Sequence, residues 1–293
     1  MWTQGKLRLY AAVAAFLTSA VCAVVWFWLQ GDSDEKHETK ACWRILGELG
    51  THSSGSIGSC GDALESAMTG KPAGSKATDG AQGATIRLAE EQSQAFEHVV
   101  NVYANRDVKR EPMPSGILMN MANALTYYRD DVSQILSAQV DYSNPAFSTE
   151  PNDIDIDTNV MREFLTAVAK DEAAFGLVRE SMFGLVTQQV NELEQDDFAR
   201  KPQGDRDHAY GVARSAGSTL GALRQARFDA LKAQDEGSGA LKEALAGKDY
   251  AAYRYSRLEQ LIRSRASSLA VPETPESKSR LEDILSRAQN SYR

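Results

Sequence analysis

Apolar residues between Ala84 and Arg293 recur at intervals of three and four, and the alternation with a period of two that strands show is almost absent. The clearest stripe lies in SGILMNMANALTYYRDDVSQILSAQ and consists of Ile117, Met121, Leu125, Tyr128, Val132 and Ile135. Methionine and aromatic residues at this spacing are typical of a buried face and not of a ligand site. The pattern therefore predicts several helices with short connections, that is, an all-α helical bundle.

Turn and capping residues mark the ends of these helices. The sequence EPMP at Glu111 to Pro114 ends the helix that follows Ala84, and DDFARKPQGDRD separates two later helical stretches. The other boundaries predict a long helix and three further helices: His208 to Gln234, Leu241 to Leu245, Tyr250 to Leu269 and Pro275 to Tyr292.

The stretch PNDIDIDTNV places Asp153, Asp155 and Asp157 at alternate positions, as a calcium-binding loop of the D-x-D-x-D type does. Such a loop also needs a glycine at its sixth position and a bidentate glutamate at its twelfth. Those positions hold Thr158 and Phe164. Aspartates also accept hydrogen bonds at a helix start, where the dipole favours acids. We therefore predict the start of a helix here and no metal site.

The N-terminal part has a different pattern. YAAVAAFLTSAVCAVVWFWL, from Tyr10 to Leu29, is an uncharged run of about 20 residues, long enough as a helix to cross a hydrocarbon core of roughly 30 Å. A cleaved signal peptide has a shorter apolar region followed by small residues, whereas this run ends in bulky aromatics that suit a membrane interface. Cys22 raises the alternative of a lipoprotein, but Val21 precedes it where such a site has a small residue. We expect an uncleaved anchor.

The charges on either side of this run predict its orientation. Lys6 and Arg8 precede it, and GDSDEKHETK after it begins with acids, so the positive-inside rule keeps the N-terminus in the cytoplasm and exports the rest. The expected parts are a cytoplasmic N-terminus (1–9), a transmembrane helix (10–29), a flexible Gly/Ser/Thr/Ala-rich linker that can hold a short helix (30–83), and an extracytoplasmic α-helical domain (84–293).

Cys42 and Cys60 are the only cysteines beyond the predicted anchor. In an oxidising compartment they could close one loop, and in the chain-entropy model a loop of this size stabilises by about 3 kcal/mol. A short helix at ACWRILGELG would then be pinned by the bridge. The alternative is two free thiols in a mobile linker, and the sequence leaves both open.

Ala213, Gly217 and Gly221 stand four apart in the predicted long helix and give it one face without bulky side chains. Small residues at this spacing let another helix approach closely. Because each interior glycine costs up to about 1 kcal/mol relative to alanine, a packing reason is expected. We predict a close helix contact at this face.

No combination of residues predicts catalysis, cofactor binding or metal binding. Of the four histidines, His37 and His52 lie in the predicted linker, and His98 and His208 have no Cys, His or carboxylate at a recognised ligand spacing. There is no G-x-S-x-G elbow, P-loop or dinucleotide motif. The formal net charge of −8 and the predicted export both argue against a nucleic-acid partner.

One stretch near the C-terminus, YAAYRYSRLEQLIRSRASS, mixes tyrosines with arginines, as a surface for an anionic partner would. Tyr255, Leu258, Ile262 and Leu269 form a narrow apolar stripe in it. The arginines are spread around that stripe: Arg254, Arg257, Arg263 and Arg265. We therefore expect a solvated helix with one buried face.

Three segments, SGILMNMANALTYYRDDVSQIL, MREFLTAVAKDEAAFGLVRESM and AGSTLGALRQARFDAL, resemble blocks of an uncharacterised helical domain. That domain occurs in large actinobacterial TPR-repeat-region-containing proteins, which are associated with type VII secretion and polymorphic toxins. The resemblance covers roughly Ala84 to Gln234. It implies an all-α extracytoplasmic or secreted domain without an established activity or catalytic residues. This chain departs from the family in its short length and its predicted anchor.

Two classes of function fit these observations. The first is a non-enzymatic interaction module that is held in the lipid bilayer by the anchor and presents a helical domain to another protein, for example as a secretion accessory or an immunity-type protein. The second is a cell-envelope enzyme, such as a hydrolase, whose site comes from residues distant in sequence. A deep acidic pocket with a perturbed carboxylate would favour the enzyme, and an exposed apolar groove would favour the module.

Overall fold

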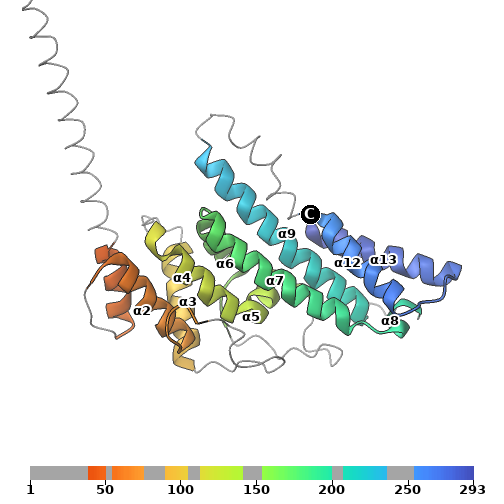
Figure 1. The fold of residues 1–293 in the computed structure, drawn as a ribbon, viewed down its shortest axis with the longest axis horizontal. Coiled ribbons are helices and arrows are strands. Elements are labelled where there is room, and N and C mark those ends of the chain that lie inside the picture. Colours follow the sequence, from red (N-terminus) through yellow and green to blue (C-terminus); the bar gives the residue numbers. More distant parts are fainter. Residues whose placement is uncertain are drawn as a thin grey trace, which may run out of the picture. The chain divides into compact units, whose positions relative to one another are not determined.

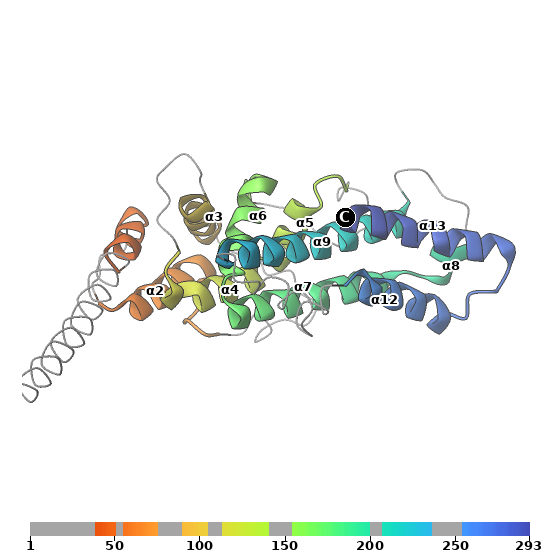
Figure 2. The same ribbon diagram turned by 90° about the horizontal axis from the view of Figure 1, so that it is seen from above.

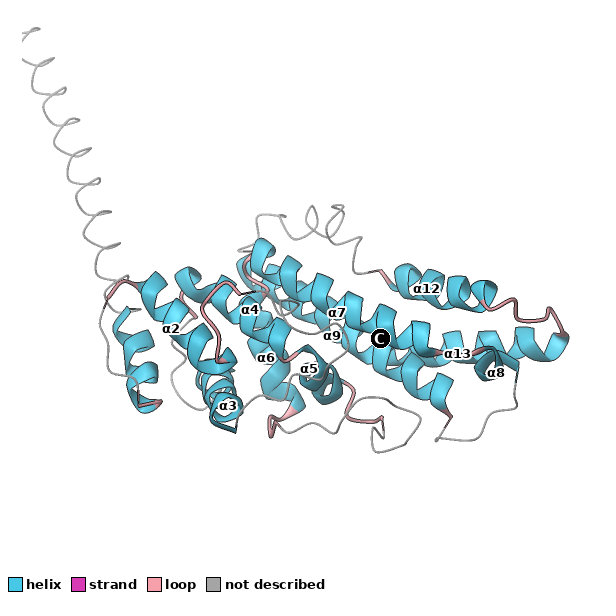
Figure 3. Cartoon of the chain, turned by 60° about the horizontal axis from the view of Figure 1, so that its bottom comes forward, coloured by secondary structure: helices cyan, strands magenta, loops and turns pink. Residues whose placement is uncertain are grey.

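The computed structural model describes residues 39–50, 55–75, 90–104, 113–140, 154–199, 207–235 and 254–293. Within these ranges the regular secondary structure is helical and includes no strand (Figures 1 and 3), which confirms the all-α prediction. No helix in these ranges is long and apolar enough to span a membrane. The predicted cytoplasmic segment, the predicted anchor Tyr10 to Leu29, and the predicted helix Leu241 to Leu245 lie outside them.

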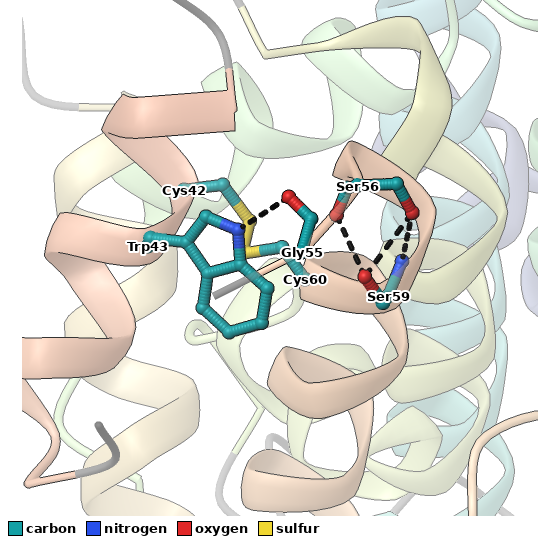
Figure 4. Close-up of a disulfide and its surroundings, with 6 residues drawn as sticks. All are labelled: Cys42, Trp43, Gly55, Ser56, Ser59 and Cys60. Carbon is teal, nitrogen blue, oxygen red and sulfur yellow. Dashed lines mark hydrogen bonds between the residues drawn. A yellow bond between two sulfur atoms is a disulfide. The ribbon is translucent and has the colours of Figure 1, made fainter. Parts of the chain in front are cut away.

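The chain divides into two compact units, residues 1–60 and 61–293. In the first unit the described chain is helical from residue 39 to 48. Cys42 on this helix forms a disulfide with Cys60, and both residues are fully buried (Figure 4). The indole N–H of Trp43 donates to the carbonyl of Gly55 at 3.1 Å beside the bridge. The disulfide and this hydrogen bond therefore both hold the segment before Cys60 against the helix at 39–48.

Helix α2, Ile57–Thr69, lies within residues 30–83, where we predicted a flexible linker with a short helix only at ACWRILGELG. Its sequence contains Gly, Ser and Ala residues that resemble a tether, but Cys60, Leu64 and Met68 recur at intervals of four and are fully buried. An apolar row at that interval forms one face of a helix. The composition of the segment hid this row.

The carboxylate of Glu65 holds α2 and the turn after it to α4 (Leu118–Tyr127). Glu65 is fully buried and accepts hydrogen bonds from Asn120 Nδ2 at 2.8 Å, Asn123 Nδ2 at 3.1 Å and the Gly74 amide at 2.7 Å. A buried carboxylate is tolerated only with such partners, because it has lost its hydration. The cluster therefore fixes this corner of the second unit.

The remaining helices of the second unit are connected by short segments where the chain is described. Their bounds are α3 Glu90–Ala104, η1 Ser115–Ile117, α5 Arg129–Leu136, α6 Thr158–Val168, α7 Glu172–Glu192, α8 Gln195–Ala199, α9 His208–Gln234, α12 Tyr255–Ser268 and α13 Pro275–Tyr292. The predicted bounds of α9 and α13 are confirmed.

The predicted stripe between Ile117 and Ile135 is buried, but the helix that carries it is broken at Tyr128, between α4 and α5. The Tyr128 ring stacks on Phe96 of α3 with centroids 4.0 Å apart, and its hydroxyl donates to the Met68 carbonyl at 2.6 Å. Burial raises the pKa of this hydroxyl. Tyr128 thus contacts two other segments at the break, and local spacing does not reveal these contacts.

The predicted helix start after the aspartates is confirmed. Asp157 is the N-cap of α6, and its side chain accepts from the amide of Asn159 at 2.7 Å. The amide of Asp155 donates to Glu97 Oε1 of α3 at 2.8 Å. Asp153 lies outside the described ranges.

Helix α9 is the central element of the second unit, with contacts to α5, α6, α7, α8, α12 and α13. Figure 2 shows α9 and α13 side by side in an upper row, with α7 and α12 in a row below them. Contacts follow the same order along α9 and α13, which therefore run parallel: Asp207 with Arg280, Gly217 with Ala288, and Gly221 with Tyr292.

The small-residue face of α9 lies against α13. A Cβ atom at Gly217 would collide with the backbone carbonyl of Ala288, and one at Gly221 would collide with that of Tyr292. Ala213, one turn earlier, is buried in the core shared by both helices. The two backbones therefore meet without side chains between them.

Candidate functional site

A groove of about 720 Å³ lies between α12 and α13, near the turn that joins them. Its apolar lining includes Phe198 of α8, Ala266 of α12, Val271 of the turn and Leu281 of α13. These residues belong to or pack on the core formed by α7, α8, α9, α12 and α13. The volume lies in the range of ligand-binding clefts.

The rim of the groove carries charges of both signs. Arg263 of α12 lies 2.9 Å from Glu259 on the same helix and 3.0 Å from Glu282 of α13. Lys278 lies 3.1 Å from Glu273. Solvent-exposed pairs of this kind contribute only about 0–1 kcal/mol each. They can therefore exchange partners with charges on a bound molecule at little cost.

Two helix caps fix the mouth of the groove. Ala270 adopts a left-handed conformation, with φ 50°, and its amide donates to the carbonyl of Ser267 at 3.1 Å, which ends α12. Thr274 and Ser277 form a capping box that starts α13. The turn is thus specified by backbone and side-chain hydrogen bonds.

The described lining includes no histidine or cysteine. Its hydroxyl side chains are Ser267 and Ser277, and the Ser277 hydroxyl is engaged in the cap of α13. An activated serine needs a base within hydrogen-bond reach. The arrangement therefore offers an apolar surface and exchangeable charges, which suit binding.

A second cluster of charged side chains joins α8, α9 and α13. Asp207, the N-cap of α9, accepts from the Tyr210 amide at 3.1 Å and forms a buried ion pair with Arg280 of α13. Arg280 also donates through Nε to the Asp197 carbonyl at 3.0 Å, and its guanidinium lies 4.2 Å from the centroid of the Tyr210 ring. His208 Nδ1 lies 3.4 Å from Asp197 Oδ2. The cluster ties three helices together.

The His208 and Asp197 side chains favour each other's charged form. The hydrogen bond to Asp197 raises the pKa of His208, against the opposite effect of burial. Burial alone would raise the pKa of Asp197, but hydrogen bonds from His208 and the Glu194 amide, with the charges of His208 and Arg280, lower it. An imidazole beside a carboxylate is a general acid–base arrangement, although neither residue lines the groove.

The residues singled out from the sequence fall in separate places. Cys42 and Cys60 form the disulfide of the first unit, and Ala213, Gly217 and Gly221 pack in the second. His37 and His52 lie outside the described ranges, and His98 lies on α3. In the part of the chain that is described, no three His, Cys, Asp or Glu side chains are grouped so that they could hold a metal ion.

Sequence reasoning missed the groove and the pairing of His208 with Asp197. One readable signal was Thr274-Pro-Glu-Ser277, in which a threonine, a proline at the first helical position and a serine three residues later mark a helix start. It would have placed a sharp turn between α12 and α13. The sequence near Phe198 did not indicate that this residue would form part of the groove lining.

Comparison with known proteins adds no relative. No protein-family model matches the chain, and no curated protein and no solved structure is similar to it. The resemblance to the helical domain of TPR-repeat-region-containing proteins stays a prediction. The function is therefore argued from the residues themselves.

Proposed function

We propose that this chain is a membrane-anchored, extracytoplasmic interaction module that binds a polypeptide segment of another protein. The observation that carries the proposal is the groove between α12 and α13, with its apolar lining of Val271 and Leu281 and its charged rim. A peptide supplies both apolar side chains and charges, and interfaces commonly place an apolar centre inside a polar rim. A role in secretion or immunity would be one specific form.

The proposed location rests on two features. The uncharged run Tyr10 to Leu29 follows Lys6 and Arg8, which favours an anchor with a cytoplasmic N-terminus. The Cys42–Cys60 disulfide is of a kind that persists in oxidising compartments and is rare in the cytosol. Both features support exposure of the helical domain outside the cytoplasm.

The competing proposal is an envelope hydrolase that uses His208 and Asp197. The observation that favours it is their 3.4 Å approach with mutually favourable shifts in pKa. A hydrolase also needs a nucleophile or an activated water beside the imidazole, with room for the substrate. The groove between α12 and α13 has neither residue on its walls, so the binding module is preferred.

The binding proposal is tested by purifying the full chain from solubilised membranes and identifying the proteins that remain bound. Val271→Asp puts a charge on the apolar lining, and we expect it to remove the partner that wild type retains. Met119→Asp is the matched control, because Met119 is an exposed apolar residue of α4 outside the groove. Equal recovery with all three proteins would overturn the proposal.

The location is tested with protease added to intact protoplasts. We expect the helical domain to be digested while the anchor stays in the membrane. Thiol labelling of the same membranes should leave Cys42 and Cys60 unmodified until a reductant is added. Full protection from protease, or a mature protein that begins after Leu29, would contradict the proposed topology.

A further inference from the structure

Four arginines from three helices and one helix cap gather at the other end of the α12–α13 pair, around the C-terminal turn of α13. Arg179 of α7, Arg254 at the N-cap of α12 and Arg257 of α12 line a small cavity together with Phe183 and Tyr292. Arg224 of α9 lies over the Tyr292 ring. Apart from Arg254 and Arg257, which are three residues apart, these side chains are distant in sequence, so the stretch around α12 did not reveal the group.

Two of these guanidinium groups lie over the faces of aromatic rings. The guanidinium carbon of Arg257 lies 4.1 Å from the centroid of Phe183, and that of Arg224 lies 5.0 Å from the centroid of Tyr292. A guanidinium above a ring is attracted by the π electrons, and this contact does not use up its N–H donors. Both groups are therefore positioned before any ligand arrives.

In the part of the chain that is described, acidic side chains do not neutralise the centre of this group. Within the described ranges Arg224, Arg254 and Arg257 have no acidic side chain at ion-pair distance, whereas Arg179 lies 3.6 Å from Glu180. On the same helix α12, Arg263 contacts two glutamates. In a chain with a net charge of −8, three neighbouring arginines with no described acidic side chain at ion-pair distance are a local exception.

We propose that Arg224, Arg254 and Arg257 bind carboxylate side chains of an acidic segment on the partner protein. The edge of a guanidinium donates two parallel N–H bonds to a carboxylate, a pairing that is stronger than one between neutral groups. The cavity between the arginines encloses only about 20 Å³, which is room for about one water molecule. A carboxylate at the tip of a side chain fits at its mouth, whereas an organic ligand with a ring does not fit inside.

This inference rests on the proposed function, because it names the chemistry of the partner protein. Its site is separate from the groove: the arginines lie at the start of α12 and the groove lies at its end. A partner could therefore use the groove without the arginines, or the arginines without the groove. Val271→Asp tests the groove and Arg254→Gln/Arg257→Gln tests the arginines, so failure of one proposal can be told from failure of the other.

The test uses the full chain in a non-ionic detergent and a fluorescein-labelled hexaglutamate peptide, with binding followed by fluorescence anisotropy at about 0.15 M salt, where long-range attraction is screened. Hexaglutamine is the neutral control peptide. We expect Arg254→Gln/Arg257→Gln to weaken hexaglutamate binding at least about tenfold. Arg129→Gln/Arg162→Gln is the matched control, since it removes the same two charges from α5 and α6, outside the lining of both sites, and we expect less than about a twofold effect.

Arg257→Lys keeps the charge but loses the planar fork, so we expect it to weaken binding as well. Its thermal unfolding midpoint should equal that of wild type, which separates lost binding from lost folding. The inference is overturned if hexaglutamate does not bind, or if Arg129→Gln/Arg162→Gln weakens binding as much as Arg254→Gln/Arg257→Gln does. It is also overturned if inorganic phosphate displaces the peptide at lower concentration than free glutamate does. If hexaglutamate binds the arginines but Val271→Asp retains the same partner proteins as wild type, the arginine site is supported and the groove is rejected as the partner site.

Discussion

Gly217 of α9 lies directly against the backbone carbonyl of Ala288 of α13, and one turn later Gly221 meets the carbonyl of Tyr292 in the same way. Gly217 and Gly221 are four positions apart in the sequence, and so are Ala288 and Tyr292. The parallel helices therefore touch through their backbones over a full turn. This contact fixes the C-terminal end of α13, which carries Tyr292 and so positions one side of the arginine site.

Alanine at Gly217 or Gly221 should lower the free energy of unfolding. The added methyl group must push two backbones apart, which costs about 1–3 kcal/mol, and the gain in helix propensity offsets at most about 1 kcal/mol. Gly176→Ala and Gly184→Ala in α7 are matched controls, because a Cβ atom there meets nothing within 4 Å. We expect these controls to raise stability by up to about 1 kcal/mol in urea unfolding. If alanine changed the free energy of unfolding in the same direction at all four glycines, the backbone contact would be contradicted.

Glu65→Ala should destabilise the protein by about 3 kcal/mol or more. The substitution leaves the partly exposed donors of Asn120, Asn123 and Gly74 without their buried charged acceptor, and hydrogen bonds to charged groups are worth about 1.5–3 kcal/mol each. Asp62→Ala is the control, because Asp62 also accepts from Asn120 but is exposed. Thermal and urea unfolding should show a loss below about 1 kcal/mol for the control. Similar losses for both variants would reject the assigned role of Glu65.

Ala270→Gly should stabilise the protein, although it removes a methyl group. Ala270 has a φ of 50°, and an L side chain in the left-handed region costs about 1–2 kcal/mol, which glycine avoids. Ser264→Gly, at an exposed position within α12, should instead destabilise by about 0.5 kcal/mol. Opposite shifts in the urea midpoint are the expected result, and a loss at both positions would contradict the left-handed cap.

The pairing of His208 with Asp197 should make stability depend on pH. Because the folded-state pKa of His208 is raised from 6.5, its contribution is full below about pH 6.5 and is lost as the pH rises through that higher pKa. The pKa of Asp197 is lowered from 3.8, so its contribution is present above about pH 3.8 and is lost as the pH falls through the lower value. We expect wild type to lose more stability than His208→Gln between about pH 6 and pH 8.5.

Urea unfolding at a series of pH values measures this difference. The double variant Asp197→Asn/His208→Gln should show the same dependence as His208→Gln alone, because the interaction is already absent in the single variant. Parallel curves for wild type and His208→Gln would show that the pair does not contribute.

Hydrophobic spacing was sufficient to predict α9 and α13, since both have clear capping residues at their ends. It failed at α2, where Cys60, Leu64 and Met68 form a buried row within a Gly- and Ser-rich segment. It also did not predict the break at Tyr128, where the side chain contacts Phe96 and Met68 of other helices. Long-range packing decides such positions.

The candidate sites depend even more on tertiary structure. The groove exists because α12 returns against α13 while α8 contributes Phe198. The arginine site combines Arg179, Arg224 and Arg257 from three helices. The sequence around α12 shows only that arginines are present. It does not show that Arg263 is paired with glutamates while Arg257 is stacked on a ring.

Site-specific photocrosslinking in intact cells tests most directly whether the groove holds a partner protein. A photoreactive phenylalanine analogue at Val271 would sit on the lining of the groove, and the same analogue at Met119 would sit on exposed α4. We predict one discrete adduct from position 271, joined to a single segment of one protein, and none from position 119. Loss of the adduct when Leu281→Asp is added would show that the groove is required. No adduct from position 271, or the same adducts from both positions, would contradict the account.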